Sequence, residues 1–172
     1  MKIKNFFLHL HTINKHRFLV CRYCFKMGLY WQGLTHDLSK YSFAEFGPSV
    51  KYFSGKHSPI EEERIDKGYS SCWLHHKGHN KHHWQYWVDF EGGEIEFLNP
   101  PKKYVKEMVA DRIAACKVYQ KDKYHPSSAI EFLQNSIERK FIPQKTYDLL
   151  EHYLQIVADN ELNTALNIIK ND

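Results

Sequence analysis

The sequence is rich in histidine, a side chain that often takes part in catalysis and metal binding. The chain has 172 residues and 12 histidines, seven of which lie between His36 and His83. Imidazole is widely used to bind transition metals and to transfer protons near neutral pH. His36 directly precedes Asp37, and such a pair can bind one divalent ion, or the carboxylate can bridge two ions that other histidines complete. The sequence therefore predicts a metal site.

Two more polar residues fall on helical faces that are otherwise apolar. At spacings of three or four residues, His16 shares a face with Ile13, Val20, Cys24 and Met27. Asp111 shares another with Tyr104, Met108, Ala115 and Val118. A buried carboxylate needs a cation or several donors. The partner of Asp111 could be a metal, or Arg112, Arg22 or a lysine, and His16 could be a hydrogen-bonded core histidine.

The ordered set His16, His36, Asp37 and Asp111 resembles the ligand set of the HD-domain superfamily of metal-dependent phosphohydrolases. The sequence is more similar still to an uncharacterised bacterial family of HD-like proteins. The segments that carry this similarity are KHR (15–17), GLYWQGLTHDLSKYSFAEF (28–46), SSCWLHHKGHNKHHWQYW (70–87) and EMVADRIAA (107–115).

The resemblance implies an activity as well as a cofactor. We expect one or two divalent ions (Mn, Fe, Co, Ni or Zn). We expect a phosphohydrolase that acts on a small phosphate ester or nucleotide by attack of a metal-bound hydroxide. In this superfamily, histidines between the HD pair and the last aspartate complete the second ion. His76 and His83 are the preferred candidates, while His75, His79 and His82 stay open as alternatives, as does a solvated turn.

The catalytic candidates are Asp37, Lys40 and His76. Lys40 follows Asp37 by three residues, so it could neutralise a phosphoryl oxygen, or it could be a cation at a helix end. Weaker candidates are Ser39, Asn80 and Arg112.

Other activities are compatible with the same residues. A di-iron oxygenase could use the same ligands. A non-catalytic module, stabilised by metal or binding nucleic acid, would agree with the basic residues 1–40, which hold seven lysines or arginines and one acid, Asp37. Cys21 and Cys24 form a CxxC motif, but no second pair stands at ligand spacing, so we do not expect a zinc knuckle.

The elements that must position these residues are predicted to be almost all helical. We expect a helix over 12–27 and a second, short helix that ends near residue 38. A third begins at Ser42, which forms a capping box with Glu45, and breaks at Gly47 and Pro48. A fourth runs from Ser58 to about Gly78. One further helix begins after Pro101, another begins at Ser128, and two more cover 146–157 and 161–169. Residues 87–97 are predicted to form a hairpin around Gly92 and Gly93. We predict an all-α, irregular HD-like bundle with one small β-hairpin. It forms a single domain over 1–172, with a motif-bearing core at 12–123 and C-terminal helices at 127–170.

Composition limits the partners. No apolar stretch is long enough to span a bilayer, and the first residues are too polar for a signal peptide, so we expect a cytoplasmic protein that does not enter membranes. The expected partner is a small anionic substrate carrying phosphate, and we do not expect nucleic acid. The oligomeric state stays open.

Overall fold

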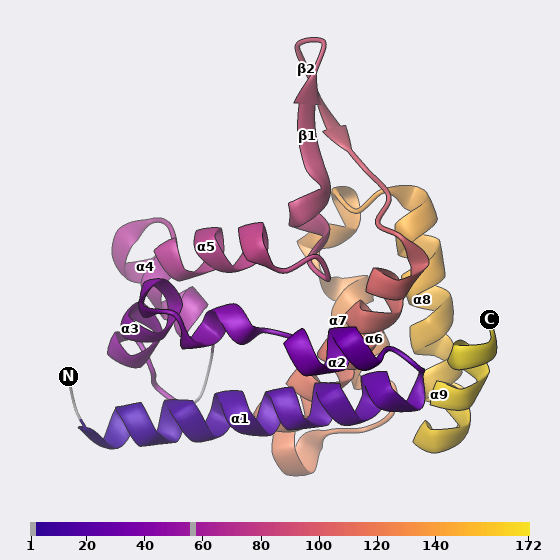
Figure 1. Cartoon of the computed structure of the whole chain (residues 1–172), viewed down its shortest axis with the longest axis horizontal. Helices are drawn as coiled ribbons and strands as arrows, with labels where there is room; N and C mark the ends of the chain where they lie inside the picture. The colour runs from indigo at the N-terminus through magenta and orange to yellow at the C-terminus, as the bar shows by residue number, and fades with distance from the viewer. Residues whose placement is uncertain (1–2, 56–57) are drawn as a thin grey trace.

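A computed structural model describes residues 3–55 and 58–172, and these form a helical molecule with one projecting hairpin (Figure 1). In the described residues the α-helices are α1 (Ile3–Lys26), α2 (Tyr30–Thr35), α3 (Phe43–Lys51), α4 (Pro59–Lys67), α5 (Ser71–His79), α6 (Lys102–Gln120), α7 (Ser128–Asn135), α8 (Gln144–Asp159) and α9 (Leu162–Asn171). Short 3₁₀ helices are η1 (Leu38–Tyr41), η2 (Trp84–Trp87), η3 (Lys121–Lys123) and η4 (Ile137–Lys140). The predicted class, mostly α with a small β-hairpin, is confirmed.

The core forms where α1 and α6 pack against each other and against the C-terminal helices. The apolar face predicted for the first helix is buried, from Ile13 to Met27, and the helix extends back to Ile3. Val20 of α1, Ile113 of α6, Leu150 of α8 and Leu166 of α9 are fully buried in one cluster. Residues from both ends of the chain therefore support the same helix pair.

The predicted helix from Ser58 to Gly78 is wrong, because the chain forms two helices there. Ser58 and Pro59 do begin α4, but the helix ends at Gly68, whose φ of 79° is left-handed. Ser70 then caps α5 by accepting a hydrogen bond from the Trp73 amide. A glycine in a left-handed conformation is a strong helix stop, and it turns α5 back toward α3.

The break expected at Gly47 and Pro48 is also wrong. Helix α3 continues through both residues to Lys51. Pro48 removes one helical hydrogen bond, but packing of α3 against α5 and α1 holds the helix together. Ser42 is the N-cap residue of α3, but its side chain makes no capping hydrogen bond, so the predicted capping box does not form. Glu45 directs its carboxylate to two histidines of α5 instead.

Strands β1 (Val88–Glu91) and β2 (Glu94–Phe97) form the predicted antiparallel hairpin. It projects away from the helices (Figure 1), and every residue of both strands is exposed. The two glycines of the turn have positive φ angles, 62° at Gly92 and 88° at Gly93, which glycine adopts at little cost.

The face of α6 that carries Asp111 is not the most buried one. Val109, Ala110, Ile113 and Ala114 have no exposed surface, whereas the Asp111 side chain is 20% exposed. The helical face that carries Asp111 instead borders two cavities, which are described below, so its carboxylate is accessible. Among the described residues, no helix combines the length and the apolarity needed to span a membrane.

Candidate metal centre

Asp37 lies at the middle of the polar cluster. It follows α2 and begins η1 with a left-handed backbone, φ 54°. Aspartate tolerates this conformation better than most residues that have a Cβ atom, and non-glycine residues in it are concentrated at functional sites. The residue is 1% exposed. The sharp turn thus places a buried carboxylate among side chains from α1, α5 and α6.

A first group of possible ligands surrounds one oxygen of this carboxylate. Asp37 Oδ2 is 3.3 Å from His36 Nε2 and 3.6 Å from His16 Nε2. His16 Nε2 lies 3.0 Å from Asp111 Oδ1 and 3.4 Å from His36 Nε2. Two donor atoms that are each about 2.1 Å from one ion, at angles of about 90° to 110°, are about 3.0 to 3.4 Å apart. Three of these four distances lie within that range and the fourth, 3.6 Å, is slightly longer, so the four side chains lie close to the spacing of a metal site.

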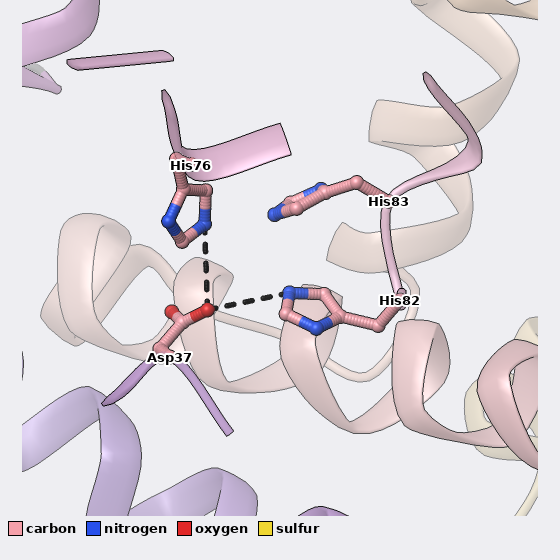
Figure 2. A group of neighbouring side chains, drawn as sticks. All are labelled: Asp37, His76, His82 and His83. Carbon is pink, nitrogen blue, oxygen red and sulfur yellow. Dashed lines mark ion pairs between the residues drawn. The ribbon is translucent and has the colours of Figure 1, made fainter. Parts of the chain in front are cut away.

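A second group surrounds the other oxygen. Asp37 Oδ1 is 3.3 Å from His76 Nε2 and 3.4 Å from His82 Nε2. Figure 2 shows both contacts, with His83 pointing into the same space. One ligand atom from each of Asp37, His76, His82 and His83 lies within 4.8 Å of the other three. Asp37 thus offers a different oxygen to each group, as a carboxylate that bridges two ions does.

Two further carboxylates lie behind the histidines. Glu107 Oε1 accepts a hydrogen bond from Nδ1 of His36 at 2.9 Å and lies 3.2 Å from Nδ1 of His82. Glu45 Oε2 accepts from Nδ1 of His76 at 2.8 Å. A carboxylate accepts only, so each of these three Nδ1 atoms carries the proton. The Nε2 lone pairs then face Asp37, the arrangement typical of histidine metal ligands.

Several buried atoms of the cluster lack a hydrogen-bond partner anywhere in the described residues. They are Asp37 Oδ1, His82 Nε2 and His83 Nε2. Burying such atoms without partners costs free energy. All three carry lone pairs that a cation accepts, and the mixture of nitrogen and oxygen donors suits a divalent transition metal. The residues present therefore fit one or two such ions.

Electrostatics keep the carboxylates ionised. Burial alone would raise the pKa of Asp37, but the nearby His36 and Lys40 hold it well below its usual range. Burial would likewise raise the pKa of Asp111, but the neighbouring His16 and His36 hold it well below its usual range. For His83, burial and then the neighbouring His82 and His76 lower the pKa well below its usual value. A neutral His83 is a competent metal ligand.

Lys40 is the cation that touches this centre. Its Nζ lies 2.6 Å from Asp37 Oδ2, and its side chain is 28% exposed. Burial would lower the pKa of Lys40, but the charges of Asp37 and Asp111 raise it. Lys40 is thus a fixed positive charge between the ligand groups and solvent.

Arg17 positions the His36–Asp37 turn on α1. Its guanidinium donates to the backbone carbonyls of His36 at 2.7 Å and Leu34 at 3.1 Å, and to Tyr41 Oη at 3.1 Å. The neighbour of His16 in sequence therefore ties down the turn that carries the other ligands. Sequence reasoning assigned no role to Arg17.

The structure brings together all six predicted metal ligands: His16, His36, Asp37, His76, His83 and Asp111. Of the open alternatives, His82 joins them. His75 instead contacts Glu45 Oε1 at 2.7 Å through Nδ1, and exposed His79 donates from Nδ1 to the His75 carbonyl. Sequence reasoning missed Glu45 and Glu107. Glu107 stands one helical turn before Asp111, which is the signal that could have found it.

Of the weaker candidates, Ser39 and Asn80 lie beside the centre, whereas Arg112 is paired with an acid elsewhere. Asn80 donates to Ser39 Oγ at 2.7 Å beside His76. Arg112 pairs with Glu138 at 3.1 Å. In the described part of the chain the ion-pair partners of Asp111 are His16 and His36, so the alternative of a salt bridge to Arg112, Arg22 or a lysine is wrong. Cys21 and Cys24 are free thiols in α1.

Two cavities border the centre. The larger has a volume of about 470 Å³ and the smaller about 290 Å³. His83 and Asp111 line both, and Lys40 lines the smaller. A small molecule can therefore reach both ligand groups.

Comparison with known proteins places the chain in a family. Residues 5–156 match the model described as a family of unknown function (DUF5662), so the chain belongs to that family. No curated protein and no solved structure matches it.

Proposed function

We propose that this member of the DUF5662 family is a metal-dependent phosphohydrolase related to the HD-domain superfamily. The observation that supports it best is the position of Asp37, which offers Oδ1 to one group of ligands and Oδ2 to another. His16, His36, Asp37 and Asp111 would hold one divalent ion, and Asp37, His76, His82 and His83 a second.

Such ions, when bound, activate water near neutral pH and polarise a phosphoryl oxygen. The chain's own residues account for the rest of the site. Asp37 serves as a ligand rather than a nucleophile. Glu45 and Glu107 keep His76 and His36 in the tautomer that presents Nε2. Lys40, on the wall of the smaller cavity, neutralises negative charge on the phosphoryl group.

The proposed substrate is a small phosphate ester that enters through the cavities. The expected phosphate binds beside Lys40. The free cysteines support a reducing compartment, so we propose the cytoplasm as the location.

A panel of phosphate esters, assayed with and without added manganese, tests this function. The proposal predicts manganese-dependent phosphate release by the wild type, and a loss of at least about a hundredfold in Asp37→Asn, because both ions lose their shared ligand. Equal phosphate release by both proteins would contradict it. Oxygen uptake by iron-loaded protein without phosphate release would favour a di-iron oxygenase instead.

A further inference from the structure

The larger cavity has walls that differ from those of the ligand groups. His82, His83 and Asp111 contribute to it on the side of the centre. Elsewhere its lining comes mainly from α5, η2, α6 and α7, with Glu61 of α4 and Glu138 of η4. Four aromatic side chains take part: Trp73, Trp84, Tyr119 and Phe132. Aromatic walls of this kind bind flat unsaturated rings by stacking and edge contacts.

Away from the centre, the charged side chains on this lining are Arg112, Glu138 and Glu61, so acids outnumber cations there. Arg112 lines the cavity, but its Nη2 is 3.1 Å from Glu138 Oε2. Glu138 Oε1 also accepts a hydrogen bond from Gln85 Nε2 at 3.3 Å. Because Arg112 is already paired, the described residues that line this cavity offer no free cation to a second phosphate group. A single anionic group belongs beside Lys40, which lines the smaller cavity only.

Phe132 stands where the two cavities meet. It lines both of them, and its side chain is 59% exposed although it belongs to the cavity wall. Trp73 also lines both, and its ring is 4.9 Å from that of His83. A ring stacked on Phe132 would therefore sit next to a group held at His83 and Asp111.

We infer that the larger cavity binds a flat, uncharged aromatic or heteroaromatic ring, so that the substrate is a monoester of one phosphate with a ring-bearing alcohol. The statement about the ester rests on the proposed function, whereas the statement about ring binding does not. A sugar phosphate without an aromatic group fits this lining poorly, because it would leave the aromatic side chains without a partner. A chain of several phosphates also fits poorly, because it would bring negative charge to an arginine that is already paired.

Binding of 1-naphthol, which carries no phosphate, tests the cavity without any reaction. Calorimetric titration of the metal-free full chain should show saturable binding to the wild type. Phe132→Ala should weaken that binding about three- to tenfold, because one stacking partner is lost. Phe132→Trp should restore it. Phe43→Ala is the matched control, since Phe43 is 99% exposed and lines neither cavity.

No binding to the wild type, or equal weakening by Phe132→Ala and Phe43→Ala, would overturn the inference. A second comparison uses the manganese-loaded protein with 1-naphthyl phosphate and glycerol phosphate. The inference predicts a KM for the naphthyl ester at least about tenfold lower, and a rise in that KM in Phe132→Ala with kcat little changed. Naphthol binding without any hydrolysis would overturn the proposed function and leave ring binding in place. Hydrolysis of both esters with equal KM values, together with no naphthol binding, would overturn ring binding and leave the proposed function in place.

Discussion

At the scale of single residues, the centre depends on which atom each side chain presents. Asp37 uses both carboxylate oxygens, and the histidines around it present Nε2 because Nδ1 is held from behind. The chemistry of such a site resides in this orientation as much as in residue type. Glu107 is the clearest case, since it contacts one histidine from each ligand group.

Glu107→Gln should weaken metal binding about 10- to 100-fold, because the amide can donate a hydrogen bond and no longer holds both Nδ1 protons. Manganese affinity measured by calorimetry checks this. The matched control is Glu96→Gln on the exposed hairpin, which should bind manganese like the wild type. An unchanged affinity in Glu107→Gln would mean that the carboxylate plays no part in orienting the histidines.

His83→Ala should reduce the number of bound ions from two to one. His83 contributes to the second group only, whereas the first group keeps all of its members. His79→Ala is the control, because exposed His79 belongs to neither group. Native mass spectrometry of protein titrated with manganese counts the ions directly. Two ions on His83→Ala, or one on His79→Ala, would refute the proposed division of ligands.

Residue patterns predicted much of this centre. His16 and Asp111 stand out because polar residues on apolar helical faces need a partner. His36 and Asp37 stand out as an adjacent pair, and the order of the four residues resembles the HD-domain ligand set. His82 could not be separated from the other open alternatives, His75 and His79, because the choice depends on how the chain leaves α5 after Asn80. The spacing of Glu45 from Ser42 fits a capping box equally well, so the sequence does not reveal that its carboxylate contacts His75 and His76.

At the scale of elements, the centre requires α5 to return toward α3 and α1. Glu63 of α4 organises that reversal. Its buried carboxylate accepts hydrogen bonds from Ser70 Oγ and Ser71 Oγ, both at 2.7 Å, and pairs with Lys67 at 2.9 Å. Burial would raise the pKa of Glu63, but these donors lower it to about 2. The carboxylate therefore ties the end of α4 to the start of α5.

Glu63→Gln should lower the free energy of unfolding by about 2 kcal/mol near pH 7, since charged hydrogen bonds are lost. The folded-state pKa is depressed, so the stabilisation is present above about pH 4.5 and declines as the pH falls toward 2. Urea unfolding of both proteins between pH 7 and pH 2.5 measures the difference. A gap that stays constant over this range would show that the ionised carboxylate is not its source.

Helix α2 can approach α1 closely because Gly33 has no side chain. A Cβ atom there would lie 3.1 Å from Cys24 Cβ and 3.2 Å from the Cys21 carbonyl oxygen. Cys21 and Cys24 thus form the part of the α1 surface against which α2 packs at Gly33. The sequence pattern identified these cysteines as candidate ligands to be discounted, but their role in helix packing depends on the partner helix and could not be predicted.

Gly33→Ala should destabilise the fold by about 1 to 3 kcal/mol, because the added methyl group forces α2 away from α1. Thermal unfolding with calorimetric detection measures the change. The matched control is Gly47→Ala within α3, where an added Cβ meets nothing within 4 Å; we expect no loss of stability there, because alanine favours helix. Equal stability of Gly33→Ala and the wild type would mean that α2 adjusts freely.

At the scale of the whole molecule, distant parts of the chain converge on one centre. The ligands come from α1, the turn before η1, α5, the segment before η2, and α6, while α8 and α9 complete the core behind α1 and α6. Periodicity predicted the hairpin and most of the helices because each pattern is local, but it did not predict the division of 58–78 at Gly68 or the continuation of α3 through Pro48. It could not predict the two cavities or the pairing of Arg112 with Glu138, since both depend on how α6, α7 and η4 pack.

Metal stoichiometry is the most direct test of the central claim that Asp37 is shared between two ions. Inductively coupled plasma analysis, after equilibration with manganese, should give two ions per chain for the wild type and at most one for Asp37→Asn, which keeps the shape of the side chain but loses its charge. Two ions in both proteins, or none in the wild type, would contradict the account.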